Sequence, residues 1–148
     1  MEKQALLSGK VSTTPIAKPR PKFRIVKNKF SKGSTVMTYY PGDYMKEEES
    51  LSLALAELRK ADEVFLGPVA VDAICLFPLP KSLSKKEKGE RMAIGWHTQK
   101  PDADNVGKFI CDAMNQIRIW ADDCQVADLR IRKRWSEEPG IFISVDAL

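Results

Sequence analysis

The segment from residue 105 to 117 constrains the fold most, because its apolar residues recur with the period of an α-helix. At i, i+3, i+4, i+7, i+8 and i+11 stand Val106, Phe109, Ile110, Ala113, Met114 and Ile117. This spacing predicts one apolar stripe packed on a core. A second stripe, on the far side, is polar: Asn105, Lys108, Asp112 and Asn115. A helix that needed only solubility would not require so ordered a polar face, so the pattern also indicates a site. Asp104 is the predicted N-cap.

Other segments predict further helices and strands. A turn at 41–43 precedes a helical pattern of Tyr44, Leu51, Leu55 and Leu58, which we expect to continue to about residue 61. Within it, the charged residues 46–49 are expected in solvent. Residues 69–77, 126–135 and 140–146 predict strands. The charged segment 81–92 predicts a short helix after Ser84, and its lysines indicate either a DNA-gripping loop or a mobile surface loop.

The chain has the length of one domain, 148 residues, and 43% of its residues are apolar, which is enough for a hydrophobic core. No apolar run approaches the roughly 20 residues of a membrane-spanning helix, and the first ten residues lack the apolar stretch of a secretory signal. We therefore expect a cytoplasmic protein. Residues 1–17 are interpreted as a loose N-terminal extension, and residues 18–148 as the domain.

The cysteine and histidine content excludes several kinds of site. Cys75, Cys111 and Cys124 are widely spaced, without the paired spacing of a zinc site, and are expected to be buried free thiols. The single histidine, His97, excludes a multi-histidine metal site within one chain. The net charge of +4 is by itself weak evidence for a nucleic-acid partner.

Two basic segments have a strand-like alternation. In one, cations alternate with prolines and apolar residues, which predicts an extended chain with these cations on one face: Lys18, Arg20, Lys22 and Arg24. The segment is either a phosphate-contacting arm or a protected edge strand. In the other, Arg130, Arg132 and Arg134 share one strand face, while Leu129, Ile131, Lys133 and Trp135 share the opposite face. The arginines either follow a phosphate backbone or pair with carboxylates on a solvated sheet.

The carboxylates carry the chemistry. Asp102 and Asp104 lie at the mouth of the predicted helix, and Lys108 lies one turn inside. If the turn with Asp122 and Asp123 folds back on this point, several carboxylates converge and need a cation between them. Oxygen ligands without His or Cys suit Mg²⁺ or Mn²⁺, which activates water and offsets charge in phosphodiester hydrolysis. The lysine would add positive charge beside the phosphate. The structural alternative is that these residues only cap a helix and form a turn.

These motifs together resemble the RusA family of Holliday junction resolvases. The resemblance rests on Lys100-Pro-Asp-Ala-Asp-Asn-Val-Gly-Lys108, on Asp112-Ala-Met-Asn115 and on Asp122-Asp-Cys-Gln-Val126. It is close over about residues 100–134 and looser in the N-terminal half.

The resemblance implies a small α+β domain with a mixed sheet flanked by helices. It also implies a homodimer with two active sites and magnesium-dependent paired nicking of four-way DNA junctions in recombination and repair. Phages and prophages often encode such enzymes. By residue match the essential residues are Asp102, Asp104, Lys108 and Asp123, the three aspartates being the metal ligands. Asp112 is either a further ligand or a residue that orients Lys108. The predicted DNA contacts are Lys18, Arg20, Lys22, Arg24, Lys100, Arg130, Arg132 and Lys133.

Two other hypotheses remain open from the residues. One is a protein that binds branched DNA without cutting it, for which the basic strands alone would suffice. The intact set of acids argues against it, since carboxylates facing phosphates bring nothing to a pure binder. The other is a magnesium-dependent nuclease that acts on RNA or on replication forks.

Overall fold

A four-stranded mixed sheet organises the chain in the computed structural model, which describes residues 3–19, 22–27, 33–39 and 42–148. The strand order is β1-β6-β4-β5, made by β1 (Ala5–Val11), β6 (Gly140–Ala147), β4 (Val69–Pro78) and β5 (Val126–Ser136). β4 runs parallel to β5 and antiparallel to β6, and β1 is antiparallel to β6. The sheet confirms the strands predicted at 69–77, 126–135 and 140–146, to within a residue or two at their ends.

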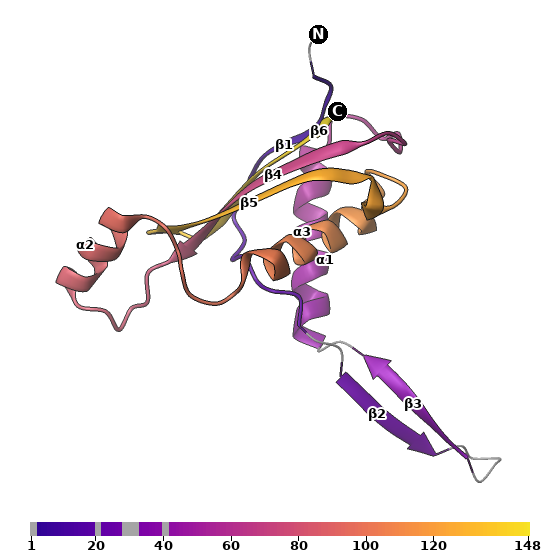
Figure 1. The fold of residues 1–148 in the computed structure, drawn as a ribbon, viewed down its shortest axis with the longest axis horizontal. Coiled ribbons are helices and arrows are strands. Elements are labelled where there is room, and N and C mark those ends of the chain that lie inside the picture. The colour runs from indigo at the N-terminus through magenta and orange to yellow at the C-terminus, as the bar shows by residue number, and fades with distance from the viewer. Residues whose placement is uncertain (1–2, 20–21, 28–32, 40–41) are drawn as a thin grey trace.

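Within the described residues, helices cover only one face of this sheet (Figure 1). α1 (Gly42–Leu58) packs on α3 (Ala103–Gln116) and on β1, and α3 also packs on β5. The apolar stripe of α3 is buried as predicted, apart from its half-buried last member, Ile117. In β4, Val71, Ala73 and Cys75 face the helices and are buried, because alternate residues of a strand point to opposite sides. The core therefore lies between the sheet and these two helices, and the other sheet face is open.

A third helix, α2 (Lys85–Ile94), lies at one end of the molecule (Figure 1). Ser84 begins it with a capping box, in which the Ser84 side chain accepts from Glu87 N and the Glu87 side chain accepts from Ser84 N. All its residues are described and none is buried. Among the helices in the described part of the chain, none is long and apolar enough to cross a membrane.

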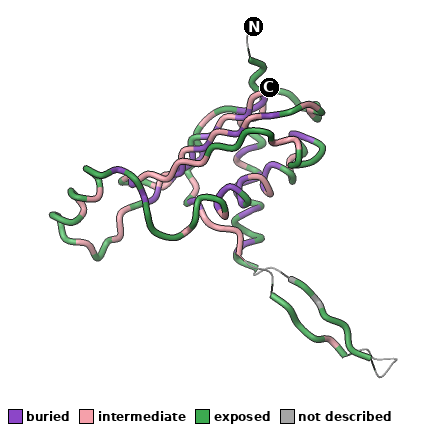
Figure 2. Tube along the Cα trace, viewed as in Figure 1, coloured by how far each residue is buried: buried purple, intermediate pink, exposed green. Residues whose placement is uncertain are grey.

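A two-stranded arm projects from the body. β2 (Lys22–Lys27) pairs antiparallel with β3 (Ser34–Tyr39), and the described residues of both strands are largely exposed (Figure 2). The extended conformation predicted for the basic segment is confirmed for residues 22–27. Its partner strand at 34–39 was not predicted.

Four predictions were wrong. Cys124 is exposed rather than buried, because it lies in a surface turn between α3 and β5, and Cys111 is only partly buried. Residues 5–11 are not a loose extension, because β1 pairs with β6 and buries Leu7 and Val11. Glu48 is not solvated, because α1 turns it toward α3, and burial raises the pKa of its carboxyl. The N-cap of α3 is Asp102 rather than Asp104, which lies in the first turn because the helix begins earlier.

Candidate functional site

A cleft opens between α3 and the start of β5. It has a volume of about 530 Å³. Its lining combines acids, lysines and a few small or apolar side chains: Lys18, Asp104, Gly107, Lys108, Cys111, Asp112, Asp123, Val126 and Leu129. Three of the four predicted catalytic residues thus line one cleft, although Asp123 comes from a different segment than Asp104 and Lys108.

The first turns of α3 supply Asp104 and Lys108. Their spacing of four residues places both side chains on one side of the helix. Asp102, as the N-cap residue, does not line the cleft, and within the described residues its carboxylate makes no capping hydrogen bond.

A short 3₁₀ turn, η1 (Asp123–Gln125), supplies Asp123. Asp122 caps this turn by accepting from Cys124 N at 3.0 Å, and that hydrogen bond lowers the pKa of the Asp122 carboxyl. The adjacent aspartates therefore have different surroundings: Asp122 closes the turn, and Asp123 faces the cleft. The family resemblance had named Asp123 of these two neighbours as the metal ligand, and that role stays a prediction.

Gln125 fastens the turn to the body, a role that sequence reasoning did not assign. Its side-chain oxygen accepts from Ala121 N at 2.8 Å and Asp122 N at 3.0 Å. Its side-chain nitrogen donates to Phe65 O and Gly67 O, both at 2.9 Å. All the hydrogen-bonding capacity of one amide is used. The glutamine of the Asp-Asp-x-Gln motif was the available signal.

Asn115 ties Asp123 to the core. Its Nδ2 donates to Asp123 Oδ2 at 3.1 Å, and its Oδ1 accepts from Trp120 Nε1 at 2.6 Å. Trp120 is buried, and an indole nitrogen only donates, so the amide must turn its oxygen to Trp120 and its nitrogen to Asp123. Asn115 was predicted in the polar stripe but without this role.

Asp112 holds Lys18 at the cleft. The Lys18 ammonium lies 2.8 Å from Asp112 Oδ2, and Tyr44 donates its hydroxyl to the same oxygen at 2.9 Å. Lys18 N also donates to Asn105 O at 3.1 Å, which joins the chain ahead of the arm to α3. Asp112 therefore contacts Lys18 and Tyr44, an arrangement that neither sequence-based alternative for Asp112 included.

Gly107 lets α3 and β5 approach each other. A Cβ atom at this position would lie 3.3 Å from Leu129 Cδ2 and 3.4 Å from Ile131 Cγ1. The first distance is tight and the second is an ordinary van der Waals contact, so a side chain at this position would require Leu129 to shift by a few tenths of an ångström. The absence of a Cβ atom at residue 107 therefore favours close packing of α3 on β5.

The aspartates of the cleft offer hard oxygen ligands, whereas its cysteine, Cys111, is held in the neutral form. Burial raises the pKa of the Cys111 thiol to about 11, and Asp123 and Asp112 add to the shift, so this thiol is neutral at ordinary pH. In the described part of the chain, no three acidic, His or Cys side chains form a ready-made metal cluster. Mg²⁺ is commonly held by one or two carboxylates together with water and substrate phosphates. Asp104 and Asp123 fit that form of binding.

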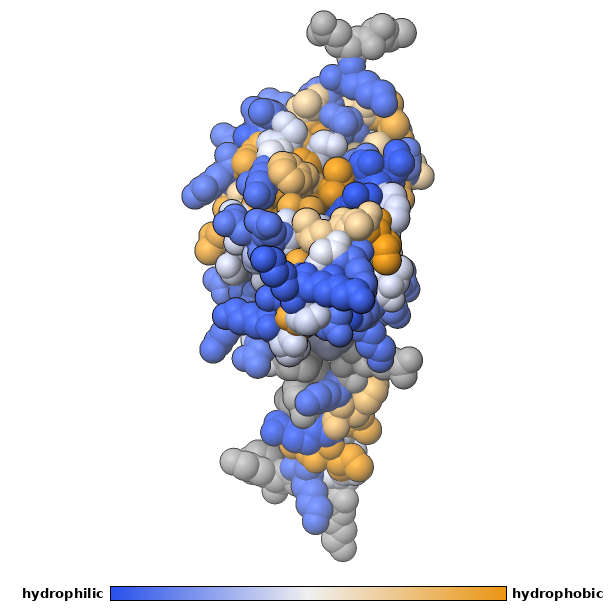
Figure 3. Space-filling model, turned by 90° about the vertical axis from the view of Figure 1, so that its left-hand side faces the viewer, coloured by the Kyte–Doolittle hydropathy of each residue, from blue (hydrophilic) through white to orange (hydrophobic). Residues whose placement is uncertain are grey.

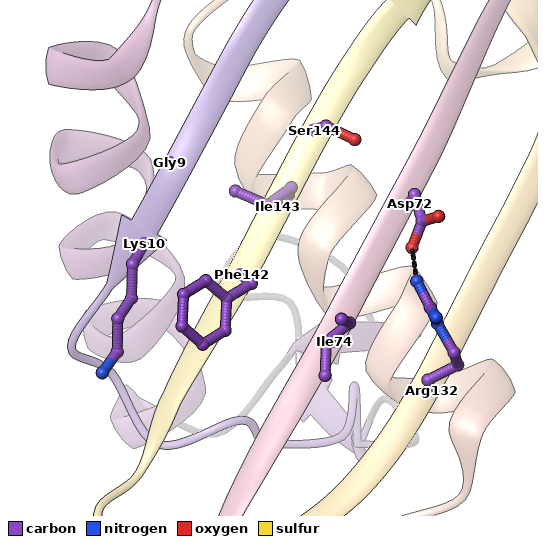
Figure 4. A pocket seen from close by; sticks show the side chains of 8 residues that line it. All are labelled: Gly9, Lys10, Asp72, Ile74, Arg132, Phe142, Ile143 and Ser144. Atoms are coloured by element: carbon purple, nitrogen blue, oxygen red, sulfur yellow. Dashed lines mark hydrogen bonds and ion pairs between the residues drawn. The ribbon is translucent and has the colours of Figure 1, made fainter.

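The other predicted DNA contacts lie outside the cleft. Arg130 and Arg132 are on the sheet face away from the helices, where Arg132 pairs with Asp72 at 2.9 Å (Figure 4). Lys133 faces the other way and donates to Gln99 O at 2.7 Å. For Arg132 the structure shows the second of the two alternatives given for these arginines, which is pairing with a carboxylate on a solvated sheet face.

The remaining predicted contacts are dispersed. Lys100 is exposed just ahead of α3, and Lys22 and Arg24 are exposed on the arm. Arg20 lies outside the described residues. Contact of any of these residues with DNA stays a prediction.

The fold and the cleft together define a small α+β protein with an acidic, lysine-containing surface site. Its sequence matches the family model described as Endodeoxyribonuclease RusA over residues 12–146. The chain therefore belongs to the RusA family of endodeoxyribonucleases. It is similar to the uncharacterized protein YqaN of Bacillus subtilis (strain 168), with 33% identity over 135 residues, which cover 88% of this chain and 89% of YqaN.

Proposed function

We propose that this protein is a magnesium-dependent endonuclease that resolves branched DNA, such as four-way junctions, by paired phosphodiester hydrolysis in recombination and repair. The observation that carries the proposal is the meeting of Asp104, Lys108 and Asp123 on one cleft. Family membership supports the reaction class.

The roles follow from the chemistry of the side chains. Asp104 and Asp123 would hold the ion, with Asp102 at the mouth of α3 as the third proposed ligand, and Mn²⁺ is expected to substitute. The bound ion supplies a water of lowered pKa and a counter-charge for the phosphate oxygens. Lys108 contributes an ammonium group next to the scissile phosphate, where it favours the charge that develops in the transition state. Lys18, held by Asp112, adds a second positive charge at the same cleft.

We further propose that the active form is a homodimer. A four-way junction has approximate two-fold symmetry, and a dimer with a two-fold axis presents the same surface twice. Two clefts related by such an axis are suited to cut two opposed strands in one binding event. Sedimentation of the free protein and of its junction complex tests this directly, and a monomer in both would contradict it.

The decisive experiment is cleavage of a synthetic four-way junction with and without Mg²⁺. We expect Asp104→Asn and Asp123→Asn to abolish cutting, because each removes a carboxylate from the cleft. The matched control is Asp122→Asn, which removes the neighbouring charge but keeps an oxygen that accepts from Cys124 N. This control should cut like the unchanged protein.

Three results would contradict the proposal. They are cutting by Asp123→Asn at the normal rate, loss of cutting in Asp122→Asn alone, and a protein that binds junctions without cutting them. The last result would support the non-catalytic binding protein instead. Comparison of junctions, forks, duplex DNA and RNA as substrates then tests the choice of substrate.

A further inference from the structure

The arm formed by β2 and β3 has two different faces. Directly opposed residues of an antiparallel pair share a face, and Ile25 lies opposite Val36. Phe23, two residues before Ile25, points to the same side. These three apolar side chains are 68%, 71% and 63% exposed in the order Phe23, Ile25, Val36. Lys22 and Arg24 lie on the opposite face of the arm, together with Val26. Lys27 follows Ile25 on the first face, so the exposed apolar group has one lysine at its end and two further cations behind it.

Hydrophobic atoms are visible on the projection below the body in Figure 3, next to hydrophilic ones. Scattered exposed apolar residues are normal on a protein surface, but a group of them on one face indicates a binding surface. An isolated two-stranded hairpin is also only marginally stable in water. The arm is therefore expected to gain contacts when a partner covers its apolar face.

The charge of the segment identifies the partner. Residues 18–39 contain seven cations and no acid; the cations are Lys18, Arg20, Lys22, Arg24, Lys27, Lys29 and Lys32. A polyanion is the complementary ligand for such a segment. Lys18, where the segment begins, lines the catalytic cleft, so a DNA strand at the cleft also lies near the base of the arm.

We propose that the apolar group of Phe23, Ile25 and Val36 binds unstacked bases at the branch point of the DNA, while Lys22 and Arg24 on the other face of the arm contact the phosphates. This inference rests on the proposed function and names the feature of the DNA that the protein recognises. Bases in a continuous duplex are stacked and covered, whereas bases at a branch point expose apolar faces to an aromatic ring. Apolar side chains inserted at opened base steps are a general device of DNA-binding proteins.

The test places 2-aminopurine, whose fluorescence rises on unstacking, at the branch point of a four-way junction, in EDTA so that nothing is cut. The unchanged protein should raise the fluorescence on binding. Phe23→Ala should lose most of this rise and bind the junction about tenfold more weakly, as expected for one lost base–aromatic contact. The matched control Leu66→Ala alters a side chain that is 77% exposed outside the arm, and it should behave like the unchanged protein.

The salt dependence of binding separates the two faces of the arm. Phe23→Ala should leave the slope of log affinity against log salt unchanged, whereas Lys22→Ala should reduce it by about one. Phe23→Trp keeps an aromatic ring and should restore both affinity and the fluorescence rise, which controls for misfolding of the arm.

Each opposite outcome overturns the inference. Phe23→Ala with an unchanged fluorescence rise would show that the face does not touch the bases. A change from dimer to monomer on sedimentation of Phe23→Ala would instead make this face an interface between two copies. If Phe23→Trp failed to restore binding, the loss of binding in Phe23→Ala would be explained by misfolding of the arm and not by a lost contact with a base. Because cutting is not measured, the inference can fail while Asp104-dependent nuclease activity remains, and the two failures are distinguishable.

Discussion

Replacement of Gln125 by glutamate tests how the turn bearing Asp123 is held. Glutamate has nearly the same shape and keeps the oxygen that accepts from Ala121 N and Asp122 N. It loses the nitrogen that donates to Phe65 O and Gly67 O, and it places a carboxylate oxygen against these two carbonyls. We expect a less stable protein and a displaced Asp123.

The magnitude follows from the two lost hydrogen bonds. Each contributes about 0.5–1.5 kcal/mol net, so their loss costs about 1–3 kcal/mol. Repulsion between the carboxylate and the two carbonyl oxygens places the expected cost in the upper half of this range at neutral pH. The repulsion raises the pKa of the introduced carboxyl above its unfolded value of about 4.3. A protonated carboxyl donates to one carbonyl, so the stabilising contribution is present below about pH 4.3 and is lost as the pH rises through the folded-state pKa.

Urea unfolding of Gln125→Glu at neutral and acid pH measures this cost, with Gln125→Met as the comparison that has no titrating group. The difference in unfolding free energy between the two variants should change with pH in the predicted direction. A Gln125→Glu protein that unfolds within about 0.5 kcal/mol of the unchanged protein at neutral pH, or a penalty independent of pH, would refute the account of the turn.

Three further predictions concern Asn115, His97 and Glu48. Asn115→Asp keeps an acceptor for Trp120 but turns a carboxylate oxygen to Asp123. Junction cleavage should therefore fall at least tenfold, while the Trp120 indole proton keeps its NMR shift. Normal cleavage would contradict this prediction. Burial first, and positive neighbours second, lower the pKa of His97. The stabilising contribution of the neutral imidazole is therefore present above about pH 6.5 and is lost as the pH falls. The variant His97→Phe should remove this part of the pH dependence of the melting temperature. Burial raises the pKa of Glu48, so the unchanged protein loses stability as the pH rises through that pKa, and Glu48→Gln should melt higher at neutral pH; an equal or lower melting temperature would oppose the assignment.

Local periodicity was sufficient to predict the elements that carry most of the site. The apolar stripe of residues 106–117 depends only on which positions face a core, and that information is contained in the spacing. The same holds for the alternation in β5, whose two faces are as predicted. The motif from Lys100 to Val126 predicted which acids and which lysine to examine, and the cleft contains three of those four residues.

Pairing between distant segments could not be predicted in this way. β1 is a short run whose burial depends on its partner β6, and the paired residues are 130 to 141 positions apart in the chain, so local patterns predicted a loose extension for residues 5–11. The second strand of the arm has few local signals and exists through its pairing with β2. The partner of Arg132, Asp72, lies on a neighbouring strand, and only the sheet register brings the two together.

The sequence by itself determined the helix that bears Lys108, the chemistry of its acids and the family, because residue type and spacing along one element are local properties. Only the tertiary structure decided that Asp123 and Asp104 line the same cleft, that Asp112 holds Lys18, and that the arginine face of β5 points away from the site. These outcomes depend on which surfaces meet across the fold. Hydrogen bonds such as those of Gln125 to residues about 60 positions away set that geometry.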